Sequence, residues 1–408
     1  MVLWALPIIA SELCRRPGQV IGIWRRFRRM YRTANMMAVL TKPMKLGEGC
    51  FKMSVYVPHW PGRAIESRAR RALRNDFVPP EQVTLAITDE CPYRCRHCSN
   101  ARGDREPLPL PRLIDLVKEI QDLGASWLNI GGGEPSLVFD RALATVKAAD
   151  ERSETWLNTI GFGLDPDKIK QLKDAGLFGG RVSIHSCDPN AHDEFVGYPG
   201  AFNIAVRTIE SFRKQDMFAV LSAAIPESMI TEEATLGFMK LGRDIGAGFV
   251  EIIPIRPSGR AVIGCTHAEL KGHHVKEDIF RRLNDDPDLL DYPAASSPAY
   301  LETPDRFGCV AGSERLYVSA SGDIQPCPLV NLAVGNVMDE PLETIWKRLH
   351  SIIPSPRAQR LCSQLGPLMD EQVRKSPGAF DILPLPPSQS NEILMKMAKC
   401  DLPKVWSL

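Results

Sequence analysis

Three cysteines lie close together, immediately after an apolar run that is typical of a β-strand: Cys91, Cys95 and Cys98. Thiolates are soft ligands that suit iron-sulfur clusters or zinc. Three of them at this spacing can surround one face of an iron-sulfur cube and leave its fourth metal position open. A structural zinc site normally closes with a fourth Cys or His, and the near candidate is His97. The spacing alone leaves three alternatives: a cluster with an open iron, a zinc site, or unligated thiols.

A second set of cysteines lies far along the chain. Twelve residues separate Cys309 from Gly322, four more separate Gly322 from Cys327, and Cys362 follows. The alternating run ERLYVS and a Ser-Gly-Asp turn predict a β-hairpin between the first two cysteines. After Cys362 the chain holds one more cysteine, Cys400. This pattern predicts a small hairpin domain that carries cysteines, which are either ligands or unligated thiols.

Further residues that can bind ligands lie at or after the next apolar runs. They are Gly132, Gly133, Glu134, Asn158, Ser183 and His185. Consecutive glycines permit positive φ and a close approach of the backbone to a ligand. His185 can contact a substrate or donate a proton, or be a hydrogen-bonded core residue. Asn158 can equally cap a turn, and Cys187 is more simply a buried thiol.

Six short apolar segments alternate with amphipathic helical segments. Strands are expected at 82–88, 126–130, 155–160, 181–186, 218–225 and 249–255. Helix starts are predicted at Asp165 before Pro166 and at Thr231, and Gly124 is a helix stop. The alternation predicts an α/β fold with a parallel sheet and right-handed crossovers. Chemistry gathers at the C-terminal strand ends of such folds, which is where the Cys91 loop falls.

The Cys91 triplet, with the aromatic-type His97 before its last cysteine, resembles the cluster motif of the radical SAM enzymes. The resemblance implies a partial, open (β/α)6 barrel. It also implies that Cys91, Cys95 and Cys98 hold a 4Fe-4S cluster whose open iron binds the amino and carboxylate groups of S-adenosylmethionine (SAM). His97 is a candidate cofactor contact on the same ground. The reduced cluster of such enzymes cleaves SAM to a 5′-deoxyadenosyl radical that abstracts hydrogen from a substrate carbon, with an electron donor such as ferredoxin or flavodoxin.

The residues at the strand ends resemble further motifs of this family. Gly132, Gly133 and Glu134 look like the GGE motif, which holds the methionyl ammonium. Asn158 is similar to the asparagine of the TNG-like segment, and Ser183 to a polar contact to the SAM ribose.

Two positions depart from the pattern of relatives that carry auxiliary clusters. Those relatives frequently have Asp where His185 stands and Arg where Val196 stands. Our catalytic candidate is His185. The segment PIRPSGRA (254–261) resembles the one that usually lies near the adenosine.

The second cysteine set resembles the auxiliary-cluster domains called SPASM and Twitch. The resemblance implies that Cys309, Cys327 and Cys362 bind a second 4Fe-4S cluster. A full SPASM pattern needs a later CxxC series, and Leu365 stands where its next cysteine would be. We therefore expect one auxiliary cluster, with Cys400, water or the substrate in the fourth position.

The first part of the chain differs in charge from the rest. Residues 1–76 hold 15 Lys and Arg against 4 Asp and Glu, whereas the whole chain has a net charge of +1. Apolar residues at helical spacing over 20–31, opposite five arginines, predict a basic amphipathic helix. Such a helix either docks on the main domain as a cap or lies on an anionic membrane surface. Nucleic-acid binding is not expected, because no recognised binding module accompanies the basic run.

These patterns divide the chain into four parts. They are a basic leader with a proline-rich, irregular connector (1–80), a radical SAM barrel (81–300), an auxiliary-cluster domain (301–365) and a C-terminal tail with a short closing helix (366–408). Eleven cysteines, an odd number, indicate a reducing compartment. No apolar run reaches the roughly 18 residues of a membrane span. We expect a cytoplasmic protein, with peripheral attachment to the inner face of the membrane if the leader binds lipid.

Three functions are consistent with these residues. The first, favoured by the leader helix, is a radical SAM enzyme acting at a membrane surface on a lipid. The second is a radical SAM maturase of a peptide or protein, as SPASM-type domains often imply. Such maturases commonly carry a leader-binding domain, and residues 1–80 lack the alternating strand pattern expected for one. The third is a non-catalytic iron-sulfur or zinc scaffold, which the joint presence of GGGEP and the Cys91 loop disfavours.

Overall fold

The computed structural model describes residues 42–74, 78–100, 105–270, 279–365 and 383–397, and isolated residues of the leader, Ile23 and Phe27 among them. These residues build one ten-stranded sheet with helices packed on it, and a separate two-stranded hairpin. The strands of the large sheet follow the order β12-β11-β10-β3-β4-β5-β6-β7-β8-β9. Strands β3 to β9 are parallel neighbours in chain order, so the predicted α/β class and parallel sheet are confirmed.

All six predicted strands are present. They are β3 (Gln82–Thr88), β4 (Trp127–Gly132), β5 (Glu154–Thr159), β6 (Gly179–Ser183), β7 (Phe218–Ile225) and β8 (Phe249–Pro254). A further parallel strand, β9 (Ala294–Ser296), continues the sheet beyond β8. It was not predicted, because a strand of three residues is too short to show an alternating pattern.

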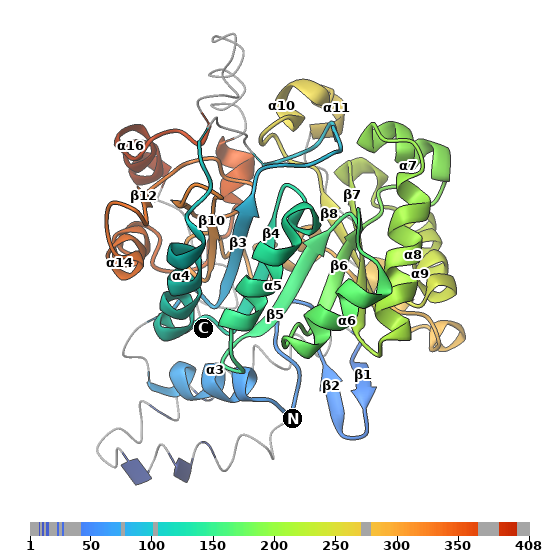
Figure 1. The fold of residues 1–408 in the computed structure, drawn as a ribbon, viewed down its shortest axis with the longest axis horizontal. Helices are drawn as coiled ribbons and strands as arrows, with labels where there is room; N and C mark the ends of the chain where they lie inside the picture. The colour runs from blue at the N-terminus through green and yellow to red at the C-terminus, as the bar shows by residue number, and fades with distance from the viewer. Residues whose placement is uncertain are drawn as a thin grey trace.

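Amphipathic helices connect the parallel strands. They are α4 (Leu110–Leu123), α5 (Phe139–Ala148), α6 (Pro166–Asp174), α7 (Pro189–Val196), α8 (Ala201–Lys214) and α9 (Glu232–Ile245). Figure 1 shows α4, α5 and α6 in front of the sheet. Asp165 and Thr231 cap α6 and α9, because their side chains accept the amides of Lys168 and Ala234. Gly124 ends α4 in the left-handed region with φ 114°. These predicted helix boundaries are confirmed.

Shorter elements follow the parallel strands. They are η2 (Pro135–Val138), η3 (Glu227–Met229), α10 (Ala261–Gly264), α11 (His267–Leu270), α12 (Ile279–Asp285), η4 (Pro287–Leu289) and α13 (Pro298–Leu301). The element η2 begins directly after the GGGE segment, and α10 lies at the same end of the sheet as the loop that leaves β3 (Figure 1). Residues expected to bind ligands are therefore held by short, well-defined turns at the C-terminal ends of the strands.

Within 41–80, the described residues 42–74 and 78–80 are not the irregular connector that the prolines predict. They contain the hairpin β1 (Met44–Gly47) and β2 (Cys50–Lys52) and the helix α3 (Arg63–Arg74). Figure 1 shows these elements at the end of the sheet opposite α10. The buried ammonium of Lys52 pairs with the carboxylate of Glu154, at the start of β5. Tyr56 likewise donates to Glu251 in β8. The segment therefore closes the N-terminal end of the strands through polar contacts, which apolar patterning does not reveal.

Two residues of the predicted basic leader helix belong to the described part of the chain. Ile23 and Phe27 are helical and buried, with 1% and 8% of their surfaces exposed. They pack in one cluster with Ala69 and Leu73 of α3. The remaining residues of the prediction over 20–31 lie outside the described residues. Among described helices, none is both long and apolar enough to cross a bilayer.

The C-terminal part adds an antiparallel extension to the sheet. Its elements are β10 (Arg315–Val318), β11 (Asp323–Gln325), β12 (Gly335–Asn336), α14 (Leu342–Ile352) and α16 (Pro387–Met397). The predicted hairpin is confirmed, and Gly322 provides its turn with φ 92°. Strand β10 pairs in parallel with β3, so the hairpin lies beside the strand that leads to Cys91. The two predicted cysteine sites thus share one continuous sheet.

Candidate active site

The loop that carries the first cysteine set leaves the C-terminal end of β3 and is anchored by α7. The ring of Tyr93 is buried and stacks on Tyr198, with 4.7 Å between the ring centroids. The Arg94 amide donates to the carbonyl of Val196 at 2.9 Å. Val196 is itself buried, so the position where relatives often carry Arg is a packing contact here.

The three thiols Cys91, Cys95 and Cys98 share one small site. Burial raises the pKa of Cys95 to about 12, and the charges of Cys98 and Cys91 add to the rise, while Arg260 opposes it. Iron must therefore displace thiol protons when it binds. Within the described residues no three His, Cys, Asp or Glu side chains converge as ligands of one metal ion would. In a four-iron cube each cysteine binds a different iron, so the three thiols need not converge on one metal position.

The glycines after β4 hold the start of this loop. A Cβ on Gly132 would lie 2.2 Å from the carbonyl oxygen of Thr88, and one on Gly133 would lie 2.1 Å from that of Glu90. The Gly133 amide donates to Thr88, and the Glu134 amide to Glu90, both at 2.7 Å. No other residue type allows this approach, because the opposing atoms are backbone. Both predicted glycines therefore contact the backbone that leads into Cys91.

Glu134 is fully buried, and its carboxyl group is surrounded by protein donors. It accepts the amide of Ile160 at 2.7 Å and the hydroxyl of Thr159 at 2.6 Å. The hydroxyl of Ser136 lies 2.6 Å from the same group and also bonds the carbonyl of Phe162. Burial raises the pKa of Glu134 despite these bonds. The carboxyl thus ties the end of β4 to the end of β5.

Asn158 and Ser183 lie at the same C-terminal edge. Asn158 is half-buried in β5. A Cβ placed on Gly131 would lie 3.2 Å from the Cβ of Asn158, so GGGEP and Asn158 are side by side. Ser183 ends β6, is half-buried, and pairs in register with Ser222 of β7. The fold therefore brings these two predicted residues to the edge where the cysteine loop lies.

Three histidines meet beside the cysteine loop. The ring of His185 lies 4.5 Å from that of His97 and 5.6 Å from that of His192, between centroids. Nδ1 of His185 accepts the Ala224 amide at 3.0 Å, which places the proton of the neutral ring on Nε2. Burial lowers the pKa of His185 well below 6.5. At neutral pH His185 is therefore a neutral hydrogen-bond donor next to the cysteine loop. His97 also stacks on Phe195 of α7 at 4.8 Å.

The segment after β8 covers the other side of the cysteine loop. The Arg260 amide donates to the carbonyl of Cys98 at 2.8 Å. A Cβ on Gly259 would lie 2.4 Å from that same oxygen, and one on Gly264 would lie 2.5 Å from the carbonyl of Arg96. Nε of Arg260 is buried without a hydrogen-bond partner among the described residues. This places a guanidinium group beside the thiols.

The second cysteine set is brought together in the C-terminal part. Cys309, Cys327 and Cys362 are buried within the main core. Burial raises the pKa of Cys309 to about 12 and that of Cys327 to about 11, and the charge of Cys362 adds to both. The three sulfurs are thus neighbours, as a shared cluster needs. Cys400, the candidate fourth ligand, lies outside the described residues.

A buried ion network links this part to the parallel strands. Glu227, after β7, accepts Arg256 at 2.6 Å, and both side chains are 2% exposed. Arg360, two residues before Cys362, reaches the other carboxylate oxygen of Glu227 at 3.2 Å. Although burial alone would raise the pKa of Glu227, the two arginines hold it below its usual value.

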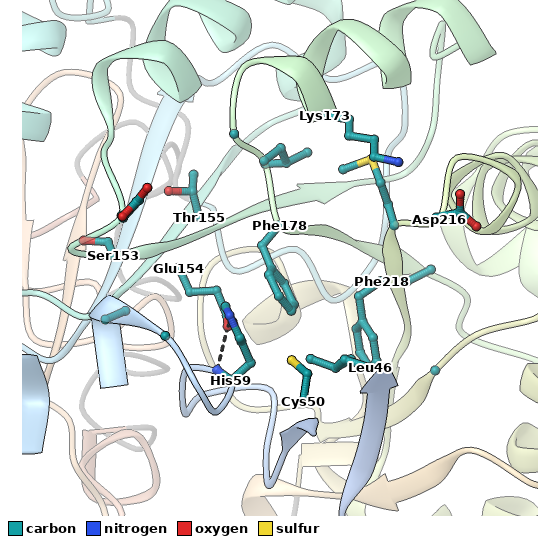
Figure 2. Close-up of a pocket in the computed structure, with 18 of the residues that line it drawn as sticks. Leu46, Cys50, His59, Ser153, Glu154, Thr155, Lys173, Phe178, Asp216 and Phe218 are labelled. Atoms are coloured by element: carbon teal, nitrogen blue, oxygen red, sulfur yellow. Dashed lines mark hydrogen bonds and ion pairs between the residues drawn. The ribbon is translucent and has the colours of Figure 1, made fainter. Parts of the chain in front are cut away.

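A cavity of about 880 Å³ lies elsewhere, at the N-terminal ends of the strands. Figure 2 shows the rings of His59, Phe178 and Phe218 in it, and the bond between His59 and Glu154. Glu154 and Phe218 are the first residues of β5 and β7, whereas the cysteine loop follows the last residue of β3. The cavity is therefore at the opposite end from the candidate active site.

Residues 85–238 match the radical SAM superfamily, and residues 309–364 match SPASM, an iron-sulfur cluster-binding domain. The chain belongs to the radical SAM superfamily. It is a radical SAM enzyme. Its cofactors are a 4Fe-4S cluster, SAM, and auxiliary iron-sulfur cluster material bound by the SPASM domain. Its mostly parallel sheet is typical of the partial radical SAM barrel.

Relatives of this radical SAM enzyme align over about two thirds of the chain. AdoMet-dependent heme synthase of Nitratidesulfovibrio vulgaris is 25% identical, covering 68% of this chain and 82% of the relative. PqqA peptide cyclase of Methylocella silvestris is 27% identical, covering 66% and 74%. Mycofactocin maturase MftC of Mycolicibacterium smegmatis is 23% identical, covering 70% and 76%. Streptococcus suis SuiB, solved with precursor peptide SuiA, shares the fold with a TM-score of 0.55 at 18% identity, covering 74% and 75%.

Three parts of this site could not be predicted from the sequence. Arg260 stood inside the segment 254–261, but nothing in the sequence showed that its backbone would bond Cys98. Asn331 of the SPASM domain bonds residues that are 72, 73 and 232 positions away, so no local pattern could reveal it. The ion pairs of Glu227 with Arg256 and Arg360 also join residues that are far apart in the sequence, so no local pattern could reveal them.

Proposed function

We propose that this radical SAM enzyme modifies a peptide or protein. The supporting observation is that relatives named peptide cyclase and maturase align across most of the chain, where both the barrel and the SPASM domain are present. The reaction begins with hydrogen abstraction from a carbon of the peptide. The bond that forms afterwards depends on the peptide, because the fold supports several outcomes.

The residues of the site then have separate roles. Cys91, Cys95 and Cys98 hold the SAM-binding cluster, and Cys309, Cys327 and Cys362 hold the auxiliary one. Bound together, cluster and SAM supply the 5′-deoxyadenosyl radical. Gly132 and Gly133 fix the start of the cysteine loop, while Asn158 and Ser183, at the ends of β5 and β6, would contact the bound cofactor. Because His185 carries its proton on Nε2, it donates a hydrogen bond to the cofactor or the peptide.

The described part of the leader supports a docked cap more than a lipid surface. A membrane helix would present its apolar face to lipid. Ile23 and Phe27 instead bury theirs against Ala69 and Leu73. Membrane attachment, a lipid substrate, the cytoplasmic location and a ferredoxin or flavodoxin donor stay predictions.

A second candidate substrate is a tetrapyrrole. Three relatives are named AdoMet-dependent heme synthase, and they align over 66% to 68% of this chain. Both candidates require the same radical site, so they differ only in what enters the barrel mouth.

Co-expression in an anaerobic host tests the proposal. The enzyme is produced with each short peptide encoded near its gene, and the peptides are analysed by mass spectrometry. We expect one peptide to change mass in the presence of the wild type, and not with the Cys91, Cys95 and Cys98 to Ala variant. If the peptides stay unmodified and the same protein converts an iron-porphyrin carboxylate in a SAM-dependent reaction, the peptide proposal is wrong and the tetrapyrrole is the substrate.

A further inference from the structure

Asn331, in the SPASM domain, makes three hydrogen bonds across the boundary with the barrel. Its Oδ1 accepts the hydroxyl of Ser258 at 2.8 Å and the amide of Gly259 at 3.0 Å. Its Nδ2 donates to the carbonyl of Ser99 at 3.2 Å. The side chain is buried, with 3% exposed, so these bonds are shielded from water. One amide thus binds both the segment after β8 and the residue that follows Cys98.

The two segments joined by Asn331 are in direct contact with each other. The amide of Arg260 donates to the carbonyl of Cys98, and Gly259 packs on that oxygen too closely for any side chain. Their relative position is therefore fixed by these two direct contacts and by the three hydrogen bonds of Asn331. Without its side chain, the buried Gly259 amide and the Ser99 carbonyl lose their hydrogen-bond partner.

The same amide is also tied to the auxiliary ligands. The Val330 amide donates to the carbonyl of Cys327 at 3.0 Å, so a tight turn connects Cys327 to Asn331. A continuous path of backbone and three hydrogen bonds therefore runs from an auxiliary cysteine to Cys98.

The contacts that Asn331 makes with Ser258 and Gly259 also determine where the positive charge of Arg260 lies. The guanidinium of Arg260 is near enough to Cys95 and His97 to lower the pKa of both. Reduction potentials of iron-sulfur clusters depend on nearby charge and on hydrogen bonds. Positive charge stabilises the extra electron of the reduced state, so a displaced Arg260 would make reduction of the cluster harder.

We propose that Asn331 is a positioning residue of the radical site, which the SPASM domain supplies to hold residues 258–260 on the Cys98 backbone. The SAM-binding loop is then complete only when the SPASM domain is docked. This role does not depend on the identity of the substrate, so it can fail or hold independently of the peptide proposal.

The test compares Asn331→Ala with Asn336→Ala in the reconstituted holoenzyme. Asn336 is a matched control, because it also makes three side-chain hydrogen bonds, but all lie within the SPASM domain. For Asn331→Ala we expect a roughly five- to tenfold weaker SAM affinity, as for the loss of one or two buried bonds. We also expect a lower potential of the SAM-binding cluster, faster amide exchange over 258–264, and an unchanged EPR signal of the auxiliary cluster. Asn336→Ala should leave SAM affinity and that potential unchanged.

Asn331→Asp keeps the inference testable if the alanine variant does not fold. Its carboxylate can still accept from Ser258 and Gly259, but it cannot donate to Ser99. We expect slow amide exchange at 259–260, as in the wild type, and faster exchange only at 99–100. The inference is overturned if either Asn331 variant matches the wild type in SAM affinity, potential and exchange. Equal effects of Asn331→Ala and Asn336→Ala would also overturn it, because they would indicate a loss of domain stability alone.

Discussion

Gly133 shows how a single missing side chain fixes the candidate active site. A Cβ there would meet the carbonyl of Glu90 at 2.1 Å, and backbone cannot yield as a flexible side chain can. We expect Gly133→Ala to lower the free energy of unfolding by about 1 to 3 kcal/mol, the usual cost of overpacking, and to weaken binding of the SAM cluster. Urea titration and iron analysis measure the two effects.

Gly237→Ala is the matched control for that substitution. Gly237 lies inside α9, and a Cβ there would have one ordinary contact, 3.7 Å from Sγ of Cys187. Alanine is the better helix former, so this variant should be unchanged or more stable by about 0.5 to 1 kcal/mol. If the two variants lose the same stability, the close approach to Glu90 does not constrain the loop.

His192 should make stability depend on pH. Burial lowers its pKa from 6.5 to about 4, and Asp193 opposes the shift only in part. The folded protein therefore binds less proton than the unfolded chain. The contribution of neutral, buried His192 to the free energy of unfolding is complete above about pH 6.5 and is lost as the pH falls towards 4. His192→Asn keeps an acceptor for the His185 amide but has no group that titrates in this range. The free energy of unfolding of this variant should therefore fall less than that of the wild type between pH 7 and pH 5.5 in urea titrations. Equal slopes would contradict this assignment.

The sequence indicated the chemistry-bearing residues but not all their contacts. The spacing of Cys91, Cys95 and Cys98 is local, so it is visible in the sequence, whereas Cys309, Cys327 and Cys362 are far apart and were predicted as one set only from their resemblance to SPASM domains. Glu134 was expected to hold the SAM ammonium, yet four donor groups of the protein surround its carboxyl. Those donors come from the turn after β4 and from β5, and their convergence depends on strand register.

Strand β10 and the loop before Cys362 join the SPASM domain to the barrel, and Glu227 is central to that junction. Glu227→Ala would leave Arg256 buried with no carboxylate beside it. We expect a loss of about 3 to 5 kcal/mol in the free energy of unfolding, the range for one partner removed from a buried pair. Urea unfolding measures this, with Glu227→Gln as the variant of similar shape.

The comparison for Glu227 is an exposed pair in α14. Nζ of Lys347 lies 2.7 Å from Oε1 of Glu343, and each side chain is 60% exposed. Glu343→Ala should cost less than about 1 kcal/mol, because water screens such pairs. A similar small cost for Glu227→Ala would mean that the network does not hold the junction.

Elements with a strong pattern were predicted well, and short polar ones were not. The six predicted parallel strands are buried at almost every position because helices and the barrel interior cover both faces, and most of them carry apolar runs that are visible in the sequence. Hairpin β1–β2 lacks that signal: β2 ends on Lys52, which is buried only because Glu154 meets it. Helix α3 is strongly amphipathic but so rich in arginine that the segment is polar overall, and it was missed for that reason.

The whole molecule should carry two clusters on one sheet. Reconstituted wild type should hold about eight irons, four at each site. Replacing Cys309, Cys327 and Cys362 by Ala should leave about half, because α7 and GGGEP also anchor the Cys91 loop and none of the three hydrogen bonds of Asn331 involves a cysteine side chain. Iron analysis with Mössbauer spectroscopy measures this. A wild type with one cluster after full reconstitution would contradict the assignment of the SPASM cysteines.

The most direct test of the radical site is reductive cleavage of SAM. Anaerobic, reconstituted protein is incubated with dithionite and SAM, and 5′-deoxyadenosine is quantified by chromatography. We expect release by the wild type and by a control in which Cys14, Cys50 and Cys187 are replaced by Ala, since these lie outside both cysteine sets. Replacing Cys91, Cys95 and Cys98 by Ala should abolish release. Cleavage at the wild-type rate by that last variant would contradict the placement of the radical site on the β3 loop.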